Sequence, residues 1–249
     1  MSTISGNRTA AIIAAAGSGR RMNSVVAKQY LCLSGIPVVV HAMSPFEKAK
    51  SVDEIVLVVP VADIDFVKQN IVRAYGFEKV THVLSGGEKR QDSVMEALRR
   101  IRDEVDVVVI HDGARPFVET GHIDMLIREA RSCGAVVTGI PVTDTIKMVN
   151  SEYRVTRTID RTMLWQAQTP QAFDKNLIME AYISAYKNGF YGTDDASLVE
   201  RMGIEVRMVR GTLKNIKITT EDDIQFALQL IGGNRGNRRF NATADNRSK

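Results

Sequence analysis

The sequence is poor in cysteine and has no long hydrophobic run, and each absence excludes a class of protein. Its two cysteines, Cys32 and Cys133, stand far apart and belong to no CxxC or Cys/His cluster, which argues against a zinc site or a disulfide framework. No apolar run approaches the ~18 residues that span a bilayer. The N-terminal segment MSTISGNRT also lacks the apolar core of a signal peptide. We therefore expect a cytoplasmic protein that has no membrane partner.

Two common phosphate-binding motifs are missing as well. The P-loop pattern, GxxxxGK followed by Ser or Thr, matches no segment. The dinucleotide fingerprint GxGxxG is met only by Gly17-Ser18-Gly19, and residues 37–40, about 20 positions further on, contain no acid. These absences argue against a P-loop NTPase and against a Rossmann dehydrogenase.

The chain has little net charge outside its C-terminal end. Residues 232–249 hold five Lys or Arg residues and one Asp, which accounts for the whole formal charge of +4. The body therefore has no net basic excess for a nucleic-acid partner. With 44% hydrophobic and 25% charged residues, the composition is that of a soluble globular protein. We expect one domain over residues 1–231 and a basic, flexible tail over 232–249.

Short apolar runs rich in β-branched residues alternate with segments of helical period. The candidate strands are residues 9–14, 54–60, 79–84, 106–111, 135–141 and 205–209. Apolar residues at i, i+3, i+4 and i+7 predict helices around 94–101, 123–130 and 224–231, and Thr220 with Asp223 forms a capping-box pattern before the last helix. This alternation predicts an α/β fold with a mostly parallel, Rossmann-like sheet covered by helices.

Three candidate binding loops follow predicted strands. The first joins small residues to cations and contains Ala15, Ala16, Gly17, Gly19, Arg21 and Lys28. The second, SGGEKRQDS, contains Gly87, Glu88, Arg90 and Ser93, and the third, HDGARP, contains Asp112 and Arg115. Glycines let backbone N–H groups approach an anion, and a carboxylate at a strand end can hold a magnesium ion. His111, at the end of the fourth strand, is better interpreted as a core residue than as a base.

These loops should meet at one edge of the sheet. Crossover connections between parallel strands run one way, so the loops after the first, third, fourth and fifth strands open on the same side. Lys217, in the late segment KNIKIT, is a further cation at a strand end. An edge with several cations and one useful acid, Asp112, suits a nucleoside triphosphate and a metal ion.

The motifs AAAGSGRRM with Lys28-Gln29-Tyr30, GGxxRxxS, HDGARP and NIKIT occur in this order. Together they resemble the 2-C-methyl-D-erythritol 4-phosphate cytidylyltransferases over residues 10–231. Three positions depart from the usual family pattern: Ala27 replaces a proline, Glu88 an aspartate and Gly113 an alanine.

The resemblance implies transfer of CMP from CTP to 2-C-methyl-D-erythritol 4-phosphate, with Mg²⁺ or another divalent cation. It implies that Arg21, Lys28 and Lys217 are catalytic, and that Asp112 binds the metal. The implied CTP contacts are Ala15, Ala16, Gly17, Gly19, Gly87, Glu88, Ser93 and Asp112. The implied acceptor contacts are Arg115, Thr145, Arg161 and Thr193.

Residues 142–160 interrupt the α/β rhythm with two β-branched segments around a polar turn at Asn150-Ser151-Glu152, which predicts a hairpin. An isolated hairpin is marginally stable in water and needs a surface to pack on. The family resemblance implies that this arm embraces a second subunit, and that Thr145 and Arg161 then serve the partner's site. From local sequence, Arg161 fits a surface ion pair and Thr193 fits the N-cap of a helix.

Three alternatives stay open. A ribitol 5-phosphate cytidylyltransferase would share most of these loops, although AAAG and TIDR favour the first interpretation. A nucleotide-binding module without turnover would keep the fold, but Arg21, Lys28, Asp112 and Lys217 are all present. A nucleic-acid binder would have to use the short basic tail, which contains Phe240 as its one aromatic residue.

Overall fold

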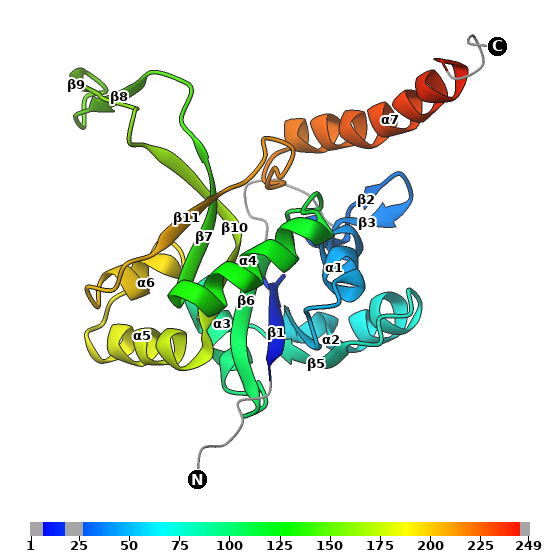
Figure 1. The fold of residues 1–249 in the computed structure, drawn as a ribbon, viewed down its shortest axis with the longest axis horizontal. Helices are drawn as coiled ribbons and strands as arrows, with labels where there is room; N and C mark the ends of the chain where they lie inside the picture. Colours follow the sequence, from blue (N-terminus) through cyan, green and yellow to red (C-terminus); the bar gives the residue numbers. More distant parts are fainter. Residues whose placement is uncertain (1–6, 18–26, 245–249) are drawn as a thin grey trace.

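A seven-stranded mixed sheet forms the centre of the computed structural model, which describes residues 7–17 and 27–244 of the chain. The strand order is β11-β7-β10-β6-β1-β4-β5 (Figure 1). Neighbouring strands run parallel except for β10, which is antiparallel to both β6 and β7. The strands are β1 (Arg8–Ala14), β4 (Glu54–Val59), β5 (Val80–Ser85), β6 (Val105–Asp112), β7 (Ala135–Pro141), β10 (Trp165–Asp174) and β11 (Arg207–Arg210). The predicted mostly parallel α/β sheet is confirmed.

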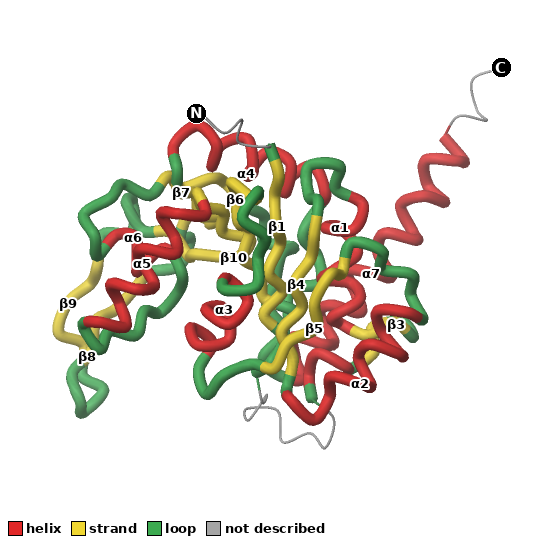
Figure 2. The backbone as a smooth tube through the Cα atoms, turned by 90° about the horizontal axis from the view of Figure 1, so that it is seen from below, coloured by secondary structure: helices red, strands yellow, loops and turns green. Residues whose placement is uncertain are grey.

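Helices cover both faces of the sheet (Figure 2). One face packs on α1 (Val38–Lys48), α2 (Ile64–Val67) and α4 (Thr120–Cys133), and the other on α3 (Arg90–Leu98), α5 (Lys175–Lys187) and α6 (Ala196–Glu200). Along β1, Ala11 and Ile13 enter the first core, whereas Ala10 and Ile12 enter the second. A strand that is buried on both faces has to be apolar throughout, which explains the unbroken run at the start of the chain.

Short elements connect these layers. Residues Lys28–Tyr30 form one turn of 3₁₀ helix, followed by the small hairpin of β2 (Cys32–Leu33) and β3 (Ile36–Pro37). A second 3₁₀ turn, Val61–Asp63, leads into α2, and a π-helical segment, Lys68–Arg73, continues it.

His111 lies at the end of β6 and is fully buried. Its Nε2 donates to the Arg115 carbonyl at 3.0 Å, and its Nδ1 lies 3.2 Å from the Thr169 hydroxyl. The imidazole also packs on Phe46, with ring centroids 5.0 Å apart. Burial lowers the pKa of His111 to about 4, so the imidazole is neutral at physiological pH. The prediction of a core histidine is confirmed, and its hydrogen bonds fix the loop that follows β6.

The predicted hairpin is also confirmed, as β8 (Ile146–Val149) paired antiparallel with β9 (Val155–Ile159). It extends from the body together with the segments that lead to it from β7 and into β10 (Figure 1). Large apolar side chains are exposed along this arm and its base: Met148, Val149, Tyr153, Val155, Met163 and Trp165. A surface of this kind is typical of an interaction site.

The last helix, α7 (Glu221–Ala244), begins with the predicted capping box. The Thr220 N–H donates to the Asp223 carboxylate at 2.8 Å, and the Asp223 N–H donates to the Thr220 hydroxyl at 3.3 Å. The predicted domain boundary at residue 231 falls inside α7 and stays a prediction. Within the described residues, no helix is long and apolar enough to cross a membrane.

The first part of α7 anchors the segment that carries Lys217. Ala227 of α7 packs with Ile218, Leu33 and Val38 in a small separate core. The Ile218 N–H also donates to the Ala114 carbonyl at 2.8 Å, which ties this segment to the loop after β6. Packing on α7 therefore holds Lys217 beside the end of β6.

Replacing Ile218 by alanine should lower the free energy of unfolding by about 2 to 4 kcal/mol, because a fully buried side chain is lost and a cavity remains. Urea denaturation measures this change. The matched control is Ile183→Ala on the exposed side of α5, which should change stability by no more than about 0.5 kcal/mol. Equal effects of the two substitutions would contradict the role of this core.

Candidate active site

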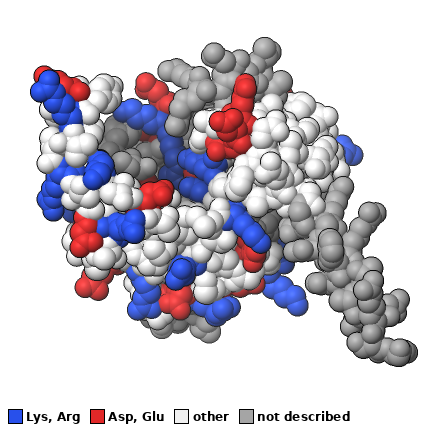
Figure 3. All heavy atoms as spheres, turned by 90° about the horizontal axis from the view of Figure 1, so that it is seen from above, with Lys and Arg blue, Asp and Glu red and all other residues white. Residues whose placement is uncertain are grey.

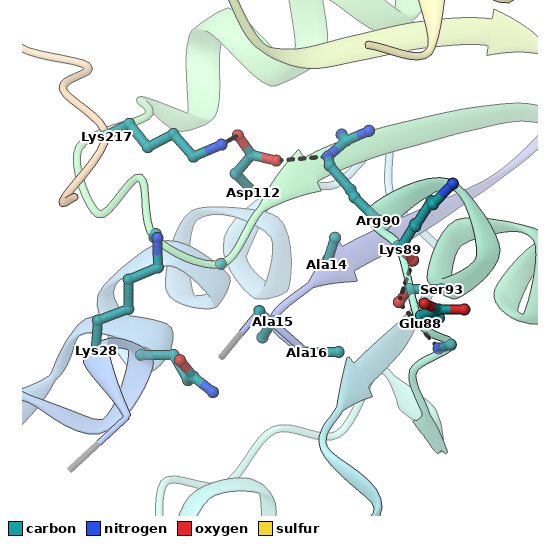
Figure 4. Close-up of a pocket in the computed structure, with 15 residues that line it drawn as sticks. Ala14, Ala15, Ala16, Lys28, Glu88, Lys89, Arg90, Ser93, Asp112 and Lys217 are labelled. Atoms are coloured by element: carbon teal, nitrogen blue, oxygen red, sulfur yellow. Dashed lines mark hydrogen bonds and ion pairs between the residues drawn. The ribbon is translucent and has the colours of Figure 1, made fainter. Parts of the chain in front are cut away.

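A pocket of about 440 Å³ opens at the carboxyl edge of the sheet, where separate segments of the chain meet (Figure 4). The loop after β1, the turn Lys28–Tyr30, the loop after β5 with the start of α3, the loop after β6 and Lys217 all contribute. The lining residues are Ala14, Ala15, Ala16, Gly17, Lys28, Gln29, Gly87, Glu88, Lys89, Arg90, Ser93, Asp112, Gly113, Ala114 and Lys217. The predicted meeting of distant loops is therefore observed.

Gly86 lets the first and second loops approach each other, and Gly87 lets the second loop pack closely on the start of α3. A Cβ at Gly86 would lie 2.2 Å from the Ala16 Cβ, and a Cβ at Gly87 would lie 2.4 Å from the Asp92 Cβ. Neither position has room for a side chain. The Gly87 N–H donates to the Ser93 hydroxyl at 3.1 Å, which holds the second loop against the first turn of α3. The resulting wall of the pocket consists largely of backbone and small side chains.

Asp112 is the centre of charge in the pocket. Its Oδ2 lies 2.8 Å from Lys217 Nζ and 3.6 Å from Arg115 Nε, and its Oδ1 accepts from Arg90 Nε at 3.0 Å. Burial alone would raise the pKa of the Asp112 carboxyl. Arg90, Lys217 and Arg115 outweigh burial and hold that pKa well below its usual range. The carboxylate is therefore charged at every physiological pH.

The secondary structure positions the side chains of Asp112, Arg90 and Lys217 so that they meet. Asp112 is the last residue of β6, and its N–H donates to the Thr169 hydroxyl of β10 at 3.0 Å. Arg90 is the first residue of α3. Lys217 reaches the carboxylate from the opposite side of the pocket to Arg90 (Figure 4). Lys28 enters the same cavity from the turn after the first loop.

The surrounding face is rich in cations. Figure 3 shows Lys and Arg side chains gathered toward the middle of the face at the carboxyl edge of the sheet. The pocket lining includes Lys28, Lys89, Arg90 and Lys217, against the two acids Glu88 and Asp112. A cavity with this balance favours a polyanionic ligand.

Nine predicted site residues line this pocket. They are Ala15, Ala16, Gly17, Lys28, Gly87, Glu88, Ser93, Asp112 and Lys217. Gly19 and Arg21 lie outside the residues that the structure describes. Arg115 is half-buried and does not line the pocket; it pairs with Asp112 and donates to the Asn215 carbonyl at 2.8 Å.

The other three predicted acceptor contacts lie away from the cavity, and all are exposed. Thr145 and Arg161 stand at the base of the arm, where Arg161 donates to the Thr143 carbonyl. The prediction that Thr193 caps the next helix is wrong. The Asp194 carboxylate instead accepts from the Ser197 N–H at 3.0 Å. The loop after the fifth predicted strand, now β7, contributes no residue to this pocket.

The sequence did not identify Asp195 as a partner of the site, nor Gln29 and Lys89 as residues that line it. This carboxylate pairs with Arg90 through both oxygens, although the two residues are 105 positions apart. The segment GTDDAS contains two adjacent acids, and nothing in the local pattern distinguishes the buried one from its neighbour.

Comparison with known proteins gives the family. Residues 9–232 match the family described as 2-C-methyl-D-erythritol 4-phosphate cytidylyltransferase. A relative of that name from Syntrophus aciditrophicus is 46% identical over 229 residues, which are 92% of this chain and 98% of that protein. Another from Clostridioides difficile is 46% identical over 220 residues, 88% of this chain and 92% of that protein.

Solved structures of similar proteins support the same family assignment. The 4-diphosphocytidyl-2C-methyl-D-erythritol synthase of Anaerococcus prevotii superimposes with a TM-score of 0.81 at 34% identity, covering 92% of this chain and 98% of that one. The 2-C-methyl-D-erythritol 4-phosphate cytidylyltransferase of Thermus thermophilus gives 0.74 at 29% identity, covering 89% and 97%. The chain therefore belongs to the 2-C-methyl-D-erythritol 4-phosphate cytidylyltransferase family.

Proposed function

We propose that the pocket around Asp112 transfers CMP from CTP to 2-C-methyl-D-erythritol 4-phosphate by direct, in-line attack. As a member of its family the chain is a cytidylyltransferase that makes 4-diphosphocytidyl-2-C-methyl-D-erythritol from these two substrates. The observation that carries the proposed site is the meeting of Lys28, Asp112 and Lys217 in one cavity. They come from three distant segments of the chain.

The loops that line the pocket would divide the contacts with CTP between them. The wall formed by the first two loops would take the base and ribose, with Gly87, Glu88 and Ser93 as contacts. The backbone at Ala15, Ala16 and Gly17 would approach the phosphates, because small residues leave N–H groups accessible to an anion. Gly19 and Arg21 of the same sequence motif are also proposed to contact the triphosphate.

The reaction needs charge stabilisation more than proton transfer. The acceptor's phosphate oxygen is already anionic and can attack the α-phosphorus directly, while the bond to pyrophosphate breaks. Lys28, Lys217 and Arg21 would neutralise the charge that builds on the α-phosphate. His111 is not available as a base, because it is buried and both ring nitrogens are engaged in hydrogen bonds.

A divalent metal, most simply Mg²⁺, would be held jointly by protein and nucleotide. Among the described residues, no group of three or more His, Cys, Asp or Glu side chains could bind a metal ion. Asp112 offers a charged carboxylate in the cavity, and Mg²⁺ in nucleotide sites commonly takes one or two carboxylates together with phosphate oxygens. These residues therefore fit the metal, which would order the triphosphate and neutralise part of its charge.

The acceptor site would be completed by a second subunit. Thr145, Arg161 and Thr193 lie outside the pocket, and the arm beside the first two exposes apolar side chains such as Met148, Tyr153 and Val155. A homodimer in which each arm packs on its partner would cover this surface and bring Arg161 to the partner's acceptor phosphate. Arg115 would support the same region through its contact with Asp112. We also propose that the protein acts in the cytoplasm.

A crossed assay tests the substrates. We expect pyrophosphate release from CTP with 2-C-methyl-D-erythritol 4-phosphate, little release with ribitol 5-phosphate, and loss of release when EDTA removes divalent metal. Preference for ribitol 5-phosphate would favour the alternative cytidylyltransferase. CTP binding without pyrophosphate release from either acceptor would indicate a non-catalytic module.

Lys28→Ala should lower kcat by about 100-fold or more, because a cation that stabilises developing charge is lost. Steady-state rates measure this at saturating CTP and acceptor. Lys187→Ala, an exposed lysine at the end of α5, is the matched control and should keep the wild-type rate. A near-wild-type kcat for Lys28→Ala in folded protein would contradict the assignment.

Subunit complementation tests the role of the arm. Lys217→Ala and Arg161→Ala should each be nearly inactive, but mixing them 1:1 after subunit exchange should restore about a quarter of the wild-type activity. Half of the dimers would then have one complete site. Sedimentation analysis measures the assembly. A dimeric mixture with no gain in activity would show that Arg161 does not serve the partner's site.

A further inference from the structure

Asp195 is a buried carboxylate that does not line the pocket, yet it contacts a residue that does. It is 1% exposed. Its Oδ1 and Oδ2 accept from Arg90 Nη1 at 2.9 Å and Nη2 at 2.7 Å. The Tyr182 hydroxyl, on α5, donates to Oδ1 at 2.5 Å. Two elements far apart in sequence therefore converge on this one side chain.

The Asp195 carboxylate has no hydrogen bond to the helix that it precedes. It occupies the N-cap position of α6, where a carboxylate usually accepts from the first turn, but it makes no capping bond. The neighbouring Asp194 performs that task through Ser197 and also accepts from Gln171 at 2.8 Å. The hydrogen bonds of Asp195 are therefore directed at Arg90 and Tyr182 instead of at α6.

The paired contact fixes how Arg90 meets Asp112. Because both Nη groups are held by Asp195, the remaining Nε–H points to Asp112 Oδ1 at 3.0 Å. This leaves Oδ2 of Asp112 for Lys217 at 2.8 Å, with Arg115 Nε further away at 3.6 Å. Without Asp195, the two Nη groups of Arg90 could turn onto Asp112 and compete with Lys217 for its oxygens, since guanidinium binds carboxylates most strongly in a paired geometry.

We propose that Asp195 is a positioning residue for cytidylyl transfer: it holds Arg90 in a single-contact geometry on Asp112, and so sets the position of Lys217 in the pocket. Tyr182 supports it by fixing the carboxylate. This proposal rests on the proposed function, because Lys217 and Asp112 are the groups that would meet the triphosphate. Under this proposal, the rate of cytidylyl transfer depends on a carboxylate that does not line the pocket.

The first test compares two adjacent acids. Asp195→Asn should lower kcat/KM by about 10- to 100-fold, the range seen when a supporting partner of a site residue is lost. Asp194→Asn is the matched control, because it removes the same charge from the next residue but does not touch Arg90. It should lower the melting temperature while leaving kcat/KM within about 2-fold. Equal kcat/KM values for Asp195→Asn and wild type would overturn the proposal.

A double-mutant cycle distinguishes positioning from general loosening of the fold. If Asp195 acts through Lys217, then adding Asp195→Asn to Lys217→Ala should cost less than about 3-fold further. Losses that multiply would mean that Asp195 acts independently of Lys217, against the proposal. If Asp195→Asn fails to fold, Tyr182→Phe takes its place and should lower kcat/KM by about 3-fold or more. No change for Tyr182→Phe would then overturn the proposal.

Calorimetric titration with CTP and Mg²⁺ separates this proposal from the proposed function. Wild-type protein that binds CTP but does not turn over either acceptor would refute the function alone. Weaker CTP binding by Asp195→Asn, with unchanged binding by Asp194→Asn, would still support the positioning role. Unchanged CTP binding by Asp195→Asn in such a protein would refute both.

Discussion

The Asp112 carboxylate and the cations around it are the interaction on which the rest of the site depends. A buried charge is costly unless it is paired, and here the pairing comes from Arg90, Arg115 and Lys217. These cations belong to the start of α3, the loop after β6 and the segment before α7. One carboxylate therefore joins three parts of the chain, and each part also contributes a wall or a neighbour of the pocket.

The fold supplies the precision that such a cluster needs. Asp112 is the last residue of β6, which pairs with β1 and β10 on either side, and the buried His111 fixes the following loop. Packing of Ile218 on α7 holds the segment with Lys217. Rigid elements position functional groups better than loops do, and here Asp112 ends β6, Arg90 begins α3 and Lys217 lies shortly before α7.

The charge arrangement also explains why a metal and a polyphosphate suit this pocket. Lys217 and Arg90 neutralise Asp112, and the carboxylate in turn keeps these cations at the edge of the cavity. A bound triphosphate would add acceptors for the lysines, and a divalent ion would add a partner for the carboxylate. In the proposed reaction, these side chains would exchange their internal ion pairs for contacts with the nucleotide and the metal. Tyr182 and α6 belong to the second core, and the Tyr182 hydroxyl completes the network by donating to Asp195.

The sequence by itself determined the alternation of strands and helices, the arm, and the loops that line the pocket, because periodicity, glycines and strand ends are local signals. The sequence also indicated that Lys28, Asp112 and Lys217 belong to the site, and all three line the pocket. Tertiary structure decided the partners: that Arg115 pairs with Asp112 without lining the pocket, that the Asp194 carboxylate and not Thr193 accepts from the first turn of α6, and that Asp195 holds Arg90 from 105 positions away. Two adjacent acids look alike in sequence, and only the packing of α5 against both α3 and α6 buries one of them beside an arginine.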